Sequence, residues 1–317
     1  MTIRQISMPQ GWTWHVCGEL TPMEREELRV DHPHFVYCLQ QDDLQRQQSP
    51  RIRSQEEGNG ALYGSLLYGG IPSRKETRDD RLFFYVNGGH LFTSRLHYEK
   101  MDGLEESELI KRLQRCNTAV EGLFALLGEL AIVCLNGLDL FAEQLTGLEQ
   151  EMREFNNSQL LDQLIERQYD LVHWQHRIVP LEELLIAAKE AFLREQLEQM
   201  DGYVTTALRV ERLMMRLDRY NDEVRSLLAM DENIASYRGN EIMKTLTVFT
   251  VICTPATVFA ALWGMNFENL PGVKNPVGYI VLGILIILLS GLMYGWLRWK
   301  GWTGDLIRGK KKNSNIV

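Results

Sequence analysis

Two long stretches without a charged side chain, separated by a short polar turn, constrain this chain most. The first runs from Leu246 to Trp263 and the second from Val277 to Leu297. A helix needs about 20 predominantly apolar residues to cross a bilayer, and both stretches meet that length once the neutral residues flanking the first are counted. The alternative is a pair of buried helices in a large soluble core, but such helices do not need unbroken apolar runs. The pattern therefore predicts a transmembrane helical hairpin.

Charge is unevenly distributed and sets the expected orientation. Residues 244–317 carry eight Lys or Arg and two acidic residues, whereas residues 1–243 carry 26 and 40. Arg298, Lys300 and the lysines at 310–312 follow the second apolar run, so the positive-inside rule places the C-terminus in the cytoplasm. Two spans return the N-terminal body to the same side. This acidic body is a poor candidate for nucleic-acid binding, which depends mainly on basic residues at phosphates.

Motifs for catalysis or for a tightly bound cofactor are not evident in the sequence. The five cysteines show no CxxC spacing, which favours reduced thiols in a cytosolic compartment. The pairs His32 with His34 and His173 with His176 lack the further ligands of a recognised zinc pattern. No nucleophile with a neighbouring base and no phosphate-binding loop is seen, so we do not expect an enzyme.

The body changes character near residue 104. Before it, alternating strands, a helix starting near Pro22 and a hairpin over "RLFFYVNGGHLFTSR" indicate an α/β domain. Asn87-Gly88 predicts a type I′ turn in that hairpin, with positive φ. After it, helical periodicity covers roughly 107–155 and 158–199.

One very long helix is expected from Gly202 to Trp263. It would be roughly 90 Å long at 1.5 Å per residue, so its cytoplasmic part must pack on something. An apolar seam recurs at alternating steps of three and four residues, as in a coiled coil. This seam, which we expect to pack on the two preceding helices, consists of Val210, Leu213, Leu217, Tyr220, Val224 and Leu227.

A second face of this helix is polar but uncharged through the membrane, and we call it the polar stripe. A ring of identical helices would line a narrow pore with it, and Met243 and Leu246 would close that pore. The alternative is that each threonine only bonds back to its own helix. The stripe consists of Asp222, Ser226, Ala229, Asn233, Tyr237, Asn240, Met243, Leu246, Thr250, Thr254, Thr257, Ala261 and Gly264.

The segment "NEIMKTLTVFTVICTPATVFAALWGMNFENLP" resembles the CorA-type magnesium transport proteins. Their signature, Gly-Met-Asn, stands here at Gly264, Met265 and Asn266, at the end of the first of two C-terminal spans. The resemblance implies a homopentamer in the inner, plasma membrane of a prokaryote, with both termini cytoplasmic and the first span lining one central pore. It also implies inward movement of Mg²⁺, and often of Co²⁺ or Ni²⁺.

The expected fold is an α+β cytoplasmic domain followed by a long helical stalk and a two-helix transmembrane hairpin, assembled as a homopentameric funnel. The expected limits are 1–104 for the α/β domain, 105–201 for the helical region, 202–245 for the stalk, 246–266 for the first span, 267–276 for the external loop, 277–297 for the second span and 298–317 for the basic tail.

The Gly-Met-Asn turn suits a hydrated ion. Mg²⁺ gives up its water reluctantly, so neutral oxygens can recognise the hydrated ion without holding it too tightly. Gly264, Met265 and Asn266 are the expected selectivity filter, and the negative end of the helix dipole points at the same mouth. Glu268 is expected to add a ring of charge at the outer mouth. The expected pore lining below the filter is Asn240, Met243, Leu246, Thr250, Thr254, Thr257 and Ala261.

Regulation by Mg²⁺ is implied by the resemblance alone. In the family an acid of the α/β domain faces an acid near the start of the stalk in the neighbouring subunit. Asp42 matches the first position, Thr205 stands at the second, and Asp201 lies about one turn earlier. We therefore assign Asp42 and Asp201 as the expected regulatory metal ligands.

Two alternative functions remain open at this point. One is a zinc transporter of the same superfamily, against which Met265 argues because relatives with that role usually depart from Met there. The other is a membrane-anchored protein whose long helix oligomerises without conducting.

Overall fold

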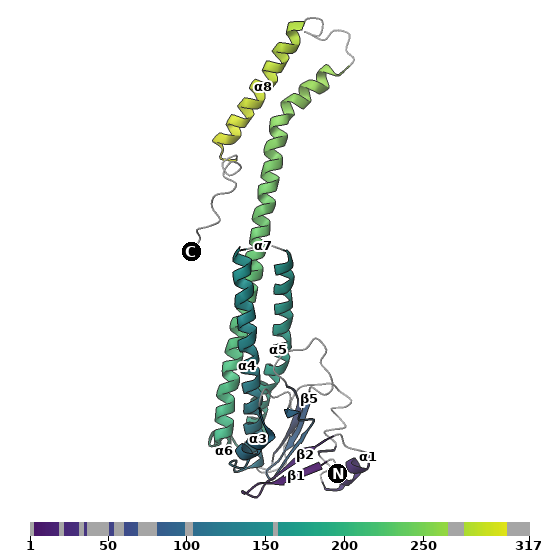
Figure 1. Cartoon of the computed structure of the whole chain (residues 1–317), viewed down its shortest axis with the longest axis vertical. Coiled ribbons are helices and arrows are strands. Elements are labelled where there is room, and N and C mark those ends of the chain that lie inside the picture. Colours follow the sequence, from purple (N-terminus) through teal and green to yellow (C-terminus); the bar gives the residue numbers. More distant parts are fainter. Residues whose placement is uncertain are drawn as a thin grey trace. The chain divides into compact units, whose positions relative to one another are not determined.

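The computed structural model divides the chain into two compact units, Met1–Leu228 and Ala229–Val317. Figure 1 shows the helices and strands, and each unit is described here by itself. The structure describes residues 3–18, 22–31, 35–36, 51–53, 60–68, 81–98, 104–154, 158–265 and 276–302.

The first unit contains a six-stranded sheet in its described residues, in the order β1-β2-β6-β5-β4-β3. Neighbouring strands are antiparallel except β2 and β6, which are parallel. The short β3, "RIR", pairs with β4, "ALYGSLL". The elements are β1 Ile3–Ser7, β2 Thr13–Cys17, α1 Pro22–Asp31, β3 Arg51–Arg53, β4 Ala61–Leu67, β5 Arg81–Val86 and β6 His90–Ser94.

The hairpin between β5 and β6 is present, but the predicted turn type is wrong. Neither Asn87 nor Gly88 has the positive φ that a type I′ turn requires. Instead, the Asn87 side-chain oxygen accepts hydrogen bonds from the backbone N–H groups of Gly89 (3.1 Å) and His90 (2.8 Å). The Asn87 side chain therefore stabilises this turn as an Asx turn, without the positive φ angles that a type I′ turn needs.

The described residues from 104 onward are mostly helical, and their helices differ from the predicted ones in two places. The helix predicted over 158–199 is broken at residues 192–193, between α5 and the short α6. The predicted helix over 107–155 is broken at residues 114–118. There Thr118 Oγ1 accepts from the Glu121 N–H, and the Glu121 carboxylate accepts from the Asn117 N–H, which is a capping pair that starts a new helix. The helices are α3 Glu106–Leu113, α4 Ala119–Glu154, α5 Ser158–Ala191, α6 Arg194–Glu198 and α7 Asp201–Trp263.

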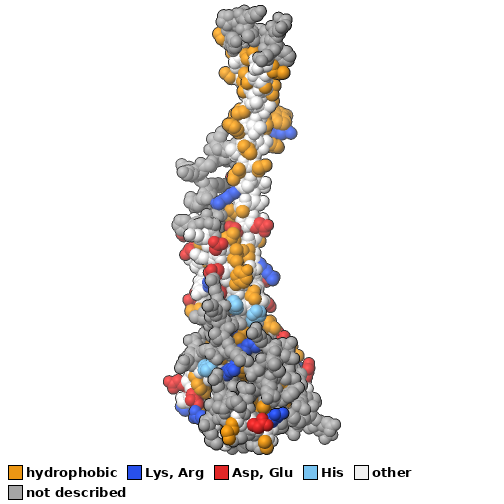
Figure 2. All heavy atoms as spheres, turned by 90° about the vertical axis from the view of Figure 1, so that its right-hand side faces the viewer, with side chains coloured by type: hydrophobic (Ala, Val, Ile, Leu, Met, Phe, Trp, Pro, Cys, Tyr) orange, Lys and Arg blue, Asp and Glu red, His pale blue; other side chains and the backbone are white. Residues whose placement is uncertain are grey.

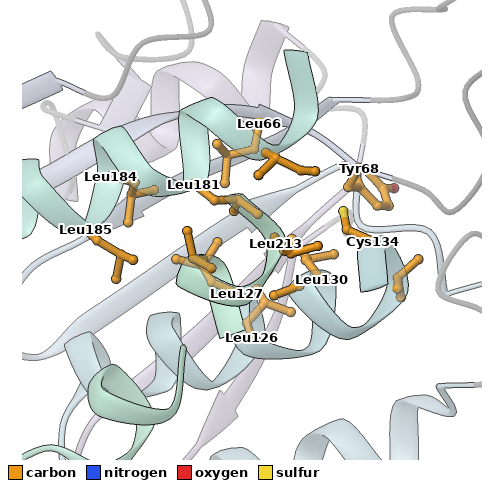
Figure 3. Packing of buried hydrophobic residues seen from close by; sticks show 14 of the residues in the cluster. Leu66, Tyr68, Leu126, Leu127, Leu130, Cys134, Leu181, Leu184, Leu185 and Leu213 are labelled. Carbon is orange, nitrogen blue, oxygen red and sulfur yellow. The ribbon is translucent and has the colours of Figure 1, made fainter. Parts of the chain in front are cut away.

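The α7 helix has 63 residues, so the prediction of one very long helix is confirmed. All six residues of its apolar seam are buried, as expected, and belong to the same core as α4, α5 and the sheet. Figure 3 shows Leu213 of α7 packed among Leu126, Leu127 and Leu130 of α4 and Leu181 of α5.

Polar contacts also join α7 to α4. The Thr206 hydroxyl of α7 donates to the Phe124 carbonyl of α4 at 2.7 Å. Arg209 of α7 pairs with the buried Glu129 of α4, which also pairs with Arg112 of α3. Because a carboxylate taken out of water needs partners, this arrangement fixes how α7 lies against α4.

The second unit holds the end of α7 and the helix α8, Pro276–Trp299. Gly301, with a φ of +76°, ends α8. The Gly301 N–H bonds the Arg298 carbonyl and the Trp302 N–H bonds the Leu297 carbonyl, which is the Schellman arrangement. Lys300 lies over the Trp296 ring with 4.9 Å to its centroid, so basic and aromatic side chains share this end of the helix.

Among the helices of the described residues, three are long and apolar enough by composition to cross a membrane, but they differ in how far they are buried. The apolar window of α4 is 72% buried, whereas those of α7 and α8 are 11% and 6% buried. Figure 2 shows hydrophobic side chains on the outside of the segment that carries α8 and the end of α7. The α4 window belongs to the core of the first unit, and α7 and α8 carry apolar surface that nothing in the described chain covers.

The contact of Trp12 with α4 offers a test of the packing in the first unit. A Cβ at Gly122 would lie 2.5 Å from a ring carbon of Trp12, whose indole N–H is held by the Cys116 carbonyl at 2.9 Å. Gly122→Ala gains about 1 kcal/mol of helix propensity but forces an overlap that costs about 1–3 kcal/mol. We expect a lower unfolding midpoint, measured by differential scanning fluorimetry.

Gly147→Ala is the matched control, because Gly147 lies in the same helix with open space at its Cβ position. It should raise the unfolding midpoint or leave it unchanged. Equal shifts in the two variants would contradict the described contact of Trp12 with α4.

Candidate functional site

The polar stripe of α7 is exposed along its whole length within one chain. All 13 of its residues, from Asp222 to Gly264, are exposed. The large apolar members are as open as the polar ones, with Tyr237 at 59%, Met243 at 63% and Leu246 at 57% exposure. The stripe is therefore not used to hold the described chain together.

The face of α7 that contacts α8 lies on the other side. Val248 and Pro255 are buried, and Ile252 is half-buried. Side chains two residues apart on a helix are about 200° apart, so Ile252 lies opposite Thr250, and Pro255 lies opposite Thr257. The contact with α8 consequently uses one side of α7 and leaves the stripe exposed.

The three threonines of the stripe bond back to carbonyls of their own helix. The hydroxyls of Thr250, Thr254 and Thr257 donate to the carbonyls four residues earlier, at 2.8, 2.7 and 3.1 Å. A hydroxyl that donates its proton still has lone pairs to accept with. These three exposed groups therefore present acceptor oxygens, and the waters of a hydrated cation present donors. The bonds to the helix therefore do not prevent the threonines from lining a pore.

The far end of the stripe is where the expected filter begins. α7 ends at Trp263, the Gly264 N–H bonds the Ala260 carbonyl at 2.9 Å, and the Met265 N–H bonds the Leu262 carbonyl at 3.4 Å. Met265 is 51% exposed. A Cβ at Gly264 would lie 3.0 Å from the Ala260 oxygen, so this position favours glycine by close approach.

Several expected residues lie outside the described residues. They are Asn266 of the filter, Glu268 of the outer mouth and Asp42 of the regulatory pair. Their roles stay predictions.

Asp201, the other expected regulatory ligand, is the first residue of α7 and is exposed, and Thr205 one turn later is exposed too. Among the described residues, no group of three or more His, Cys, Asp or Glu side chains could hold a metal ion. The pairing of Asp42 with Asp201 stays a prediction.

The cysteines of the α4 region are packing residues. Burial raises the pKa of Cys134 to about 12, and burial with the neighbouring Glu121 raises that of Cys116 to about 12 as well. Both thiols are protonated at neutral pH and are poor nucleophiles.

One contact at the site was missed by reasoning from the sequence. The Ser290 hydroxyl of α8 donates to the Ile252 carbonyl of α7 at 2.9 Å. A serine inside an apolar run was the available signal, but the rotation of α8 about its axis decides what that serine touches.

A matched pair of threonines separates the two roles of the stripe hydroxyls. Thr254 lies on the stripe, and Thr245 lies nine residues earlier, about 180° around the helix. Both are exposed and both donate to the carbonyl four residues before. If the stripe faces ions, Thr254→Val should reduce ion flux into proteoliposomes severalfold, while Thr245→Val should leave it near the parental rate. Equal effects would show that the hydroxyls act only on their own helix.

Comparison with known proteins gives consistent matches over nearly the whole chain. Residues 9–299 match the family described as CorA-like Mg²⁺ transporter protein. The chain is 32% identical over 307 residues to the magnesium transport protein CorA of Bacillus subtilis (strain 168), covering 96% of this chain and 95% of that protein. It is 20% identical over 269 residues to the cobalt/magnesium transport protein CorA of Methanocaldococcus jannaschii, covering 82% of this chain and 81% of that protein.

Solved structures agree in fold. The complete structure of the CorA magnesium transporter from Methanocaldococcus jannaschii aligns with a TM-score of 0.67 at 19% identity, over 92% of both chains. The structure of its soluble domain aligns with a TM-score of 0.52 at 16% identity, over 69% of this chain and 86% of that one. The predicted order of an α/β domain followed by long helices is thereby confirmed. With the family match over residues 9–299 and the full-length relative, the chain belongs to the CorA-like Mg²⁺ transporter protein family.

Proposed function

We propose that this chain carries Mg²⁺ into the cell through the central pore of a homopentamer, with Co²⁺ and Ni²⁺ as further candidate ions. One observation carries the proposal. The polar stripe of α7 is exposed and lies opposite the α8 contact, in a chain of the CorA-like family. Relatives of this chain are named magnesium and cobalt/magnesium transport proteins.

We infer assembly because the stripe of a single chain in lipid would have no hydrogen-bond donors for its acceptor oxygens. One α7 presents acceptor oxygens on one side of an otherwise apolar helix, and such groups in lipid are costly without donors. A ring of helices turns the stripes toward a shared axis, where water and hydrated ions supply the donors. Five copies are the number that the resemblance implies.

The membrane position rests on exposed apolar surface and on charge. The end of α7 and α8 are apolar and uncovered, and Arg298 and Lys300 follow at the C-terminal end of α8. The positive-inside rule supports both termini in the cytoplasm and Glu268 outside, and the resemblance implies the plasma membrane of a prokaryote.

Ion recognition in the proposed pore uses neutral oxygens. Asn266 and the Gly264 carbonyl would accept hydrogen bonds from the waters of Mg²⁺, an ion that dehydrates reluctantly. The C-terminal end of α7 adds the negative end of its dipole without adding a charged side chain. The driving force is the membrane potential, about 2.3 kcal/mol per charge per 100 mV.

The proposal is tested by flux of Mg²⁺, Co²⁺, Ni²⁺ and Zn²⁺ into proteoliposomes of the purified chain, compared side by side. We expect Mg²⁺ to enter and the mass in mild detergent to equal five chains. Flux of Zn²⁺ alone would indicate the zinc transporter instead. A pentamer that passes none of the four ions would indicate an oligomer that does not conduct.

The apolar neck of the proposed pore gives a prediction with a control in the same helix. Five copies of Met243 and Leu246 would close the pore by dewetting at its cytoplasmic end. Leu246→Ser should therefore raise Mg²⁺ flux severalfold when Mg²⁺ is present on the cytoplasmic side. Leu262 is also an exposed leucine of α7, about 160° away around the helix, and Leu262→Ser should leave that flux unchanged. A normally expressed Leu246→Ser variant without extra flux would argue against a gate there.

The filter gives the sharpest substitution. Asn266→Ala removes one acceptor per chain, and a hydrogen bond to a charged group contributes about 1.5–3 kcal/mol, so uptake should collapse while assembly persists. Asn266→Asp keeps an oxygen but adds charge, so Mg²⁺ should bind more tightly and pass more slowly. Uptake is measured as initial flux against Mg²⁺ concentration. If both variants give parental curves, the Gly-Met-Asn turn only connects the two spans and is not a filter.

A further inference from the structure

The hydrogen bond from Ser290 to Ile252 stands at a weak point of the α7 backbone. Pro255 lies inside α7 and has no N–H, so the Val251 carbonyl four residues earlier lacks its usual donor. Figure 1 shows a bend in the light-green C-terminal part of α7, and a proline inside a helix is one of the recognised causes of such bends.

Side-chain hydroxyls surround this weakened turn. The Thr250 carbonyl accepts from Thr254 Oγ1, the Ile252 carbonyl accepts from Ser290 Oγ, and the Cys253 carbonyl accepts from Thr257 Oγ1. Thr254 and Thr257 belong to α7 itself. Ser290 is different because it belongs to α8, so its bond ties the turn to a second helix.

We propose that Ser290 is a positioning residue for ion passage, which holds the turn before Pro255 against α8 and thereby sets the course of the polar stripe beyond it. The inference rests on the proposed function. Thr250 precedes the turn at Pro255, whereas Thr257, Ala261 and Gly264 follow it. A change in the bend therefore moves the part of the stripe after Pro255 relative to the part before it. In this role Ser290 acts through the backbone of α7, by its bond to the Ile252 carbonyl.

The transport test uses Ser290→Ala, which removes the donor, and Ser290→Thr, which keeps it. Hydrogen bonds between membrane helices are of modest strength, so we expect Ser290→Ala to lower maximal Mg²⁺ flux about threefold to about tenfold. Half-saturating Mg²⁺ and the mass of the assembly should stay parental, because Ser290→Ala removes no acceptor oxygen from the filter. Ser290→Thr should restore the parental rate.

Ser290→Ala is also tested in a chain that carries Pro255→Ala, to show whether its effect depends on the proline. Alanine returns an N–H to the Val251 carbonyl, so the turn no longer needs α8. Ser290→Ala should then add no further change in flux. The same proportional loss in both backgrounds would overturn the proposal, because Ser290 would then act independently of the proline turn.

A second measurement does not depend on transport. In a regular helix the Ala256 N–H donates to the same Ile252 carbonyl, so loosening the turn should speed hydrogen–deuterium exchange in peptides over residues 252–258. We expect faster exchange in Ser290→Ala and parental exchange in Ser290→Thr.

Parental exchange in Ser290→Ala overturns the proposal. So does faster exchange with unchanged flux, since the bond would then only join two helices. A parent chain that passes none of the ions overturns the proposed function, and the exchange arm still decides whether Ser290 holds the turn.

Discussion

Continuity of the α7 backbone is the constraint on which the rest of the structure depends. The same helix carries the buried seam from Val210 to Leu227, the apolar segment from Leu246 to Trp263 and the polar stripe. A helix of this length cannot be stable alone in water, so its first part is held by α4 and α5 through apolar packing, the Thr206 hydroxyl and the Glu129 ion pairs. Its last part makes its backbone hydrogen bonds within the helix except at Pro255, as crossing a bilayer largely requires.

The second half of α7 has two opposite faces, one that contacts α8 and one that carries the polar stripe. Val248, Ile252 and Pro255 lie on the side that meets α8, and the threonines lie on the opposite side with their protons already donated to backbone carbonyls. What they present outward is acceptor oxygen without charge. Such a surface suits an ion that keeps its water, because donors come from the ion's own hydration shell and no strong ligand holds it in place.

Elements with strong periodicity were predictable from the sequence, and elements decided by local side-chain bonds or by tertiary contacts were not. The seam of α7 followed from its spacing, and every one of its residues is buried. The turn at Asn87 was mistaken because an Asn-Gly pair suits two turn types, and the bonds of the Asn87 side chain choose between them. The break before α4 carried a recognisable signal in Thr118 and Glu121, which the apolar periodicity around it concealed.

The candidate site divides in the same way. The polar stripe could be read from helical spacing, because all its members lie on one element. The contact of Ser290 with Ile252 depends on how two apolar helices rotate against each other, and their sequences restrict that rotation only weakly. The pairing of Asp42 with Asp201 rests on the resemblance and on contacts between copies of the chain, which one chain's sequence cannot specify.

Recognition of a hydrated ion by uncharged oxygens is the central claim, and competition by an inert mimic tests it most directly. Cobalt(III) hexaammine holds its six ligands without exchange and presents N–H donors around a compact cation. If the pore reads the hydration shell, this complex should raise the Mg²⁺ concentration needed for half-maximal flux into proteoliposomes, and it should do so more weakly in Asn266→Ala. Unchanged Mg²⁺ flux in excess hexaammine would contradict the account, because the ion would then have to shed water to be recognised.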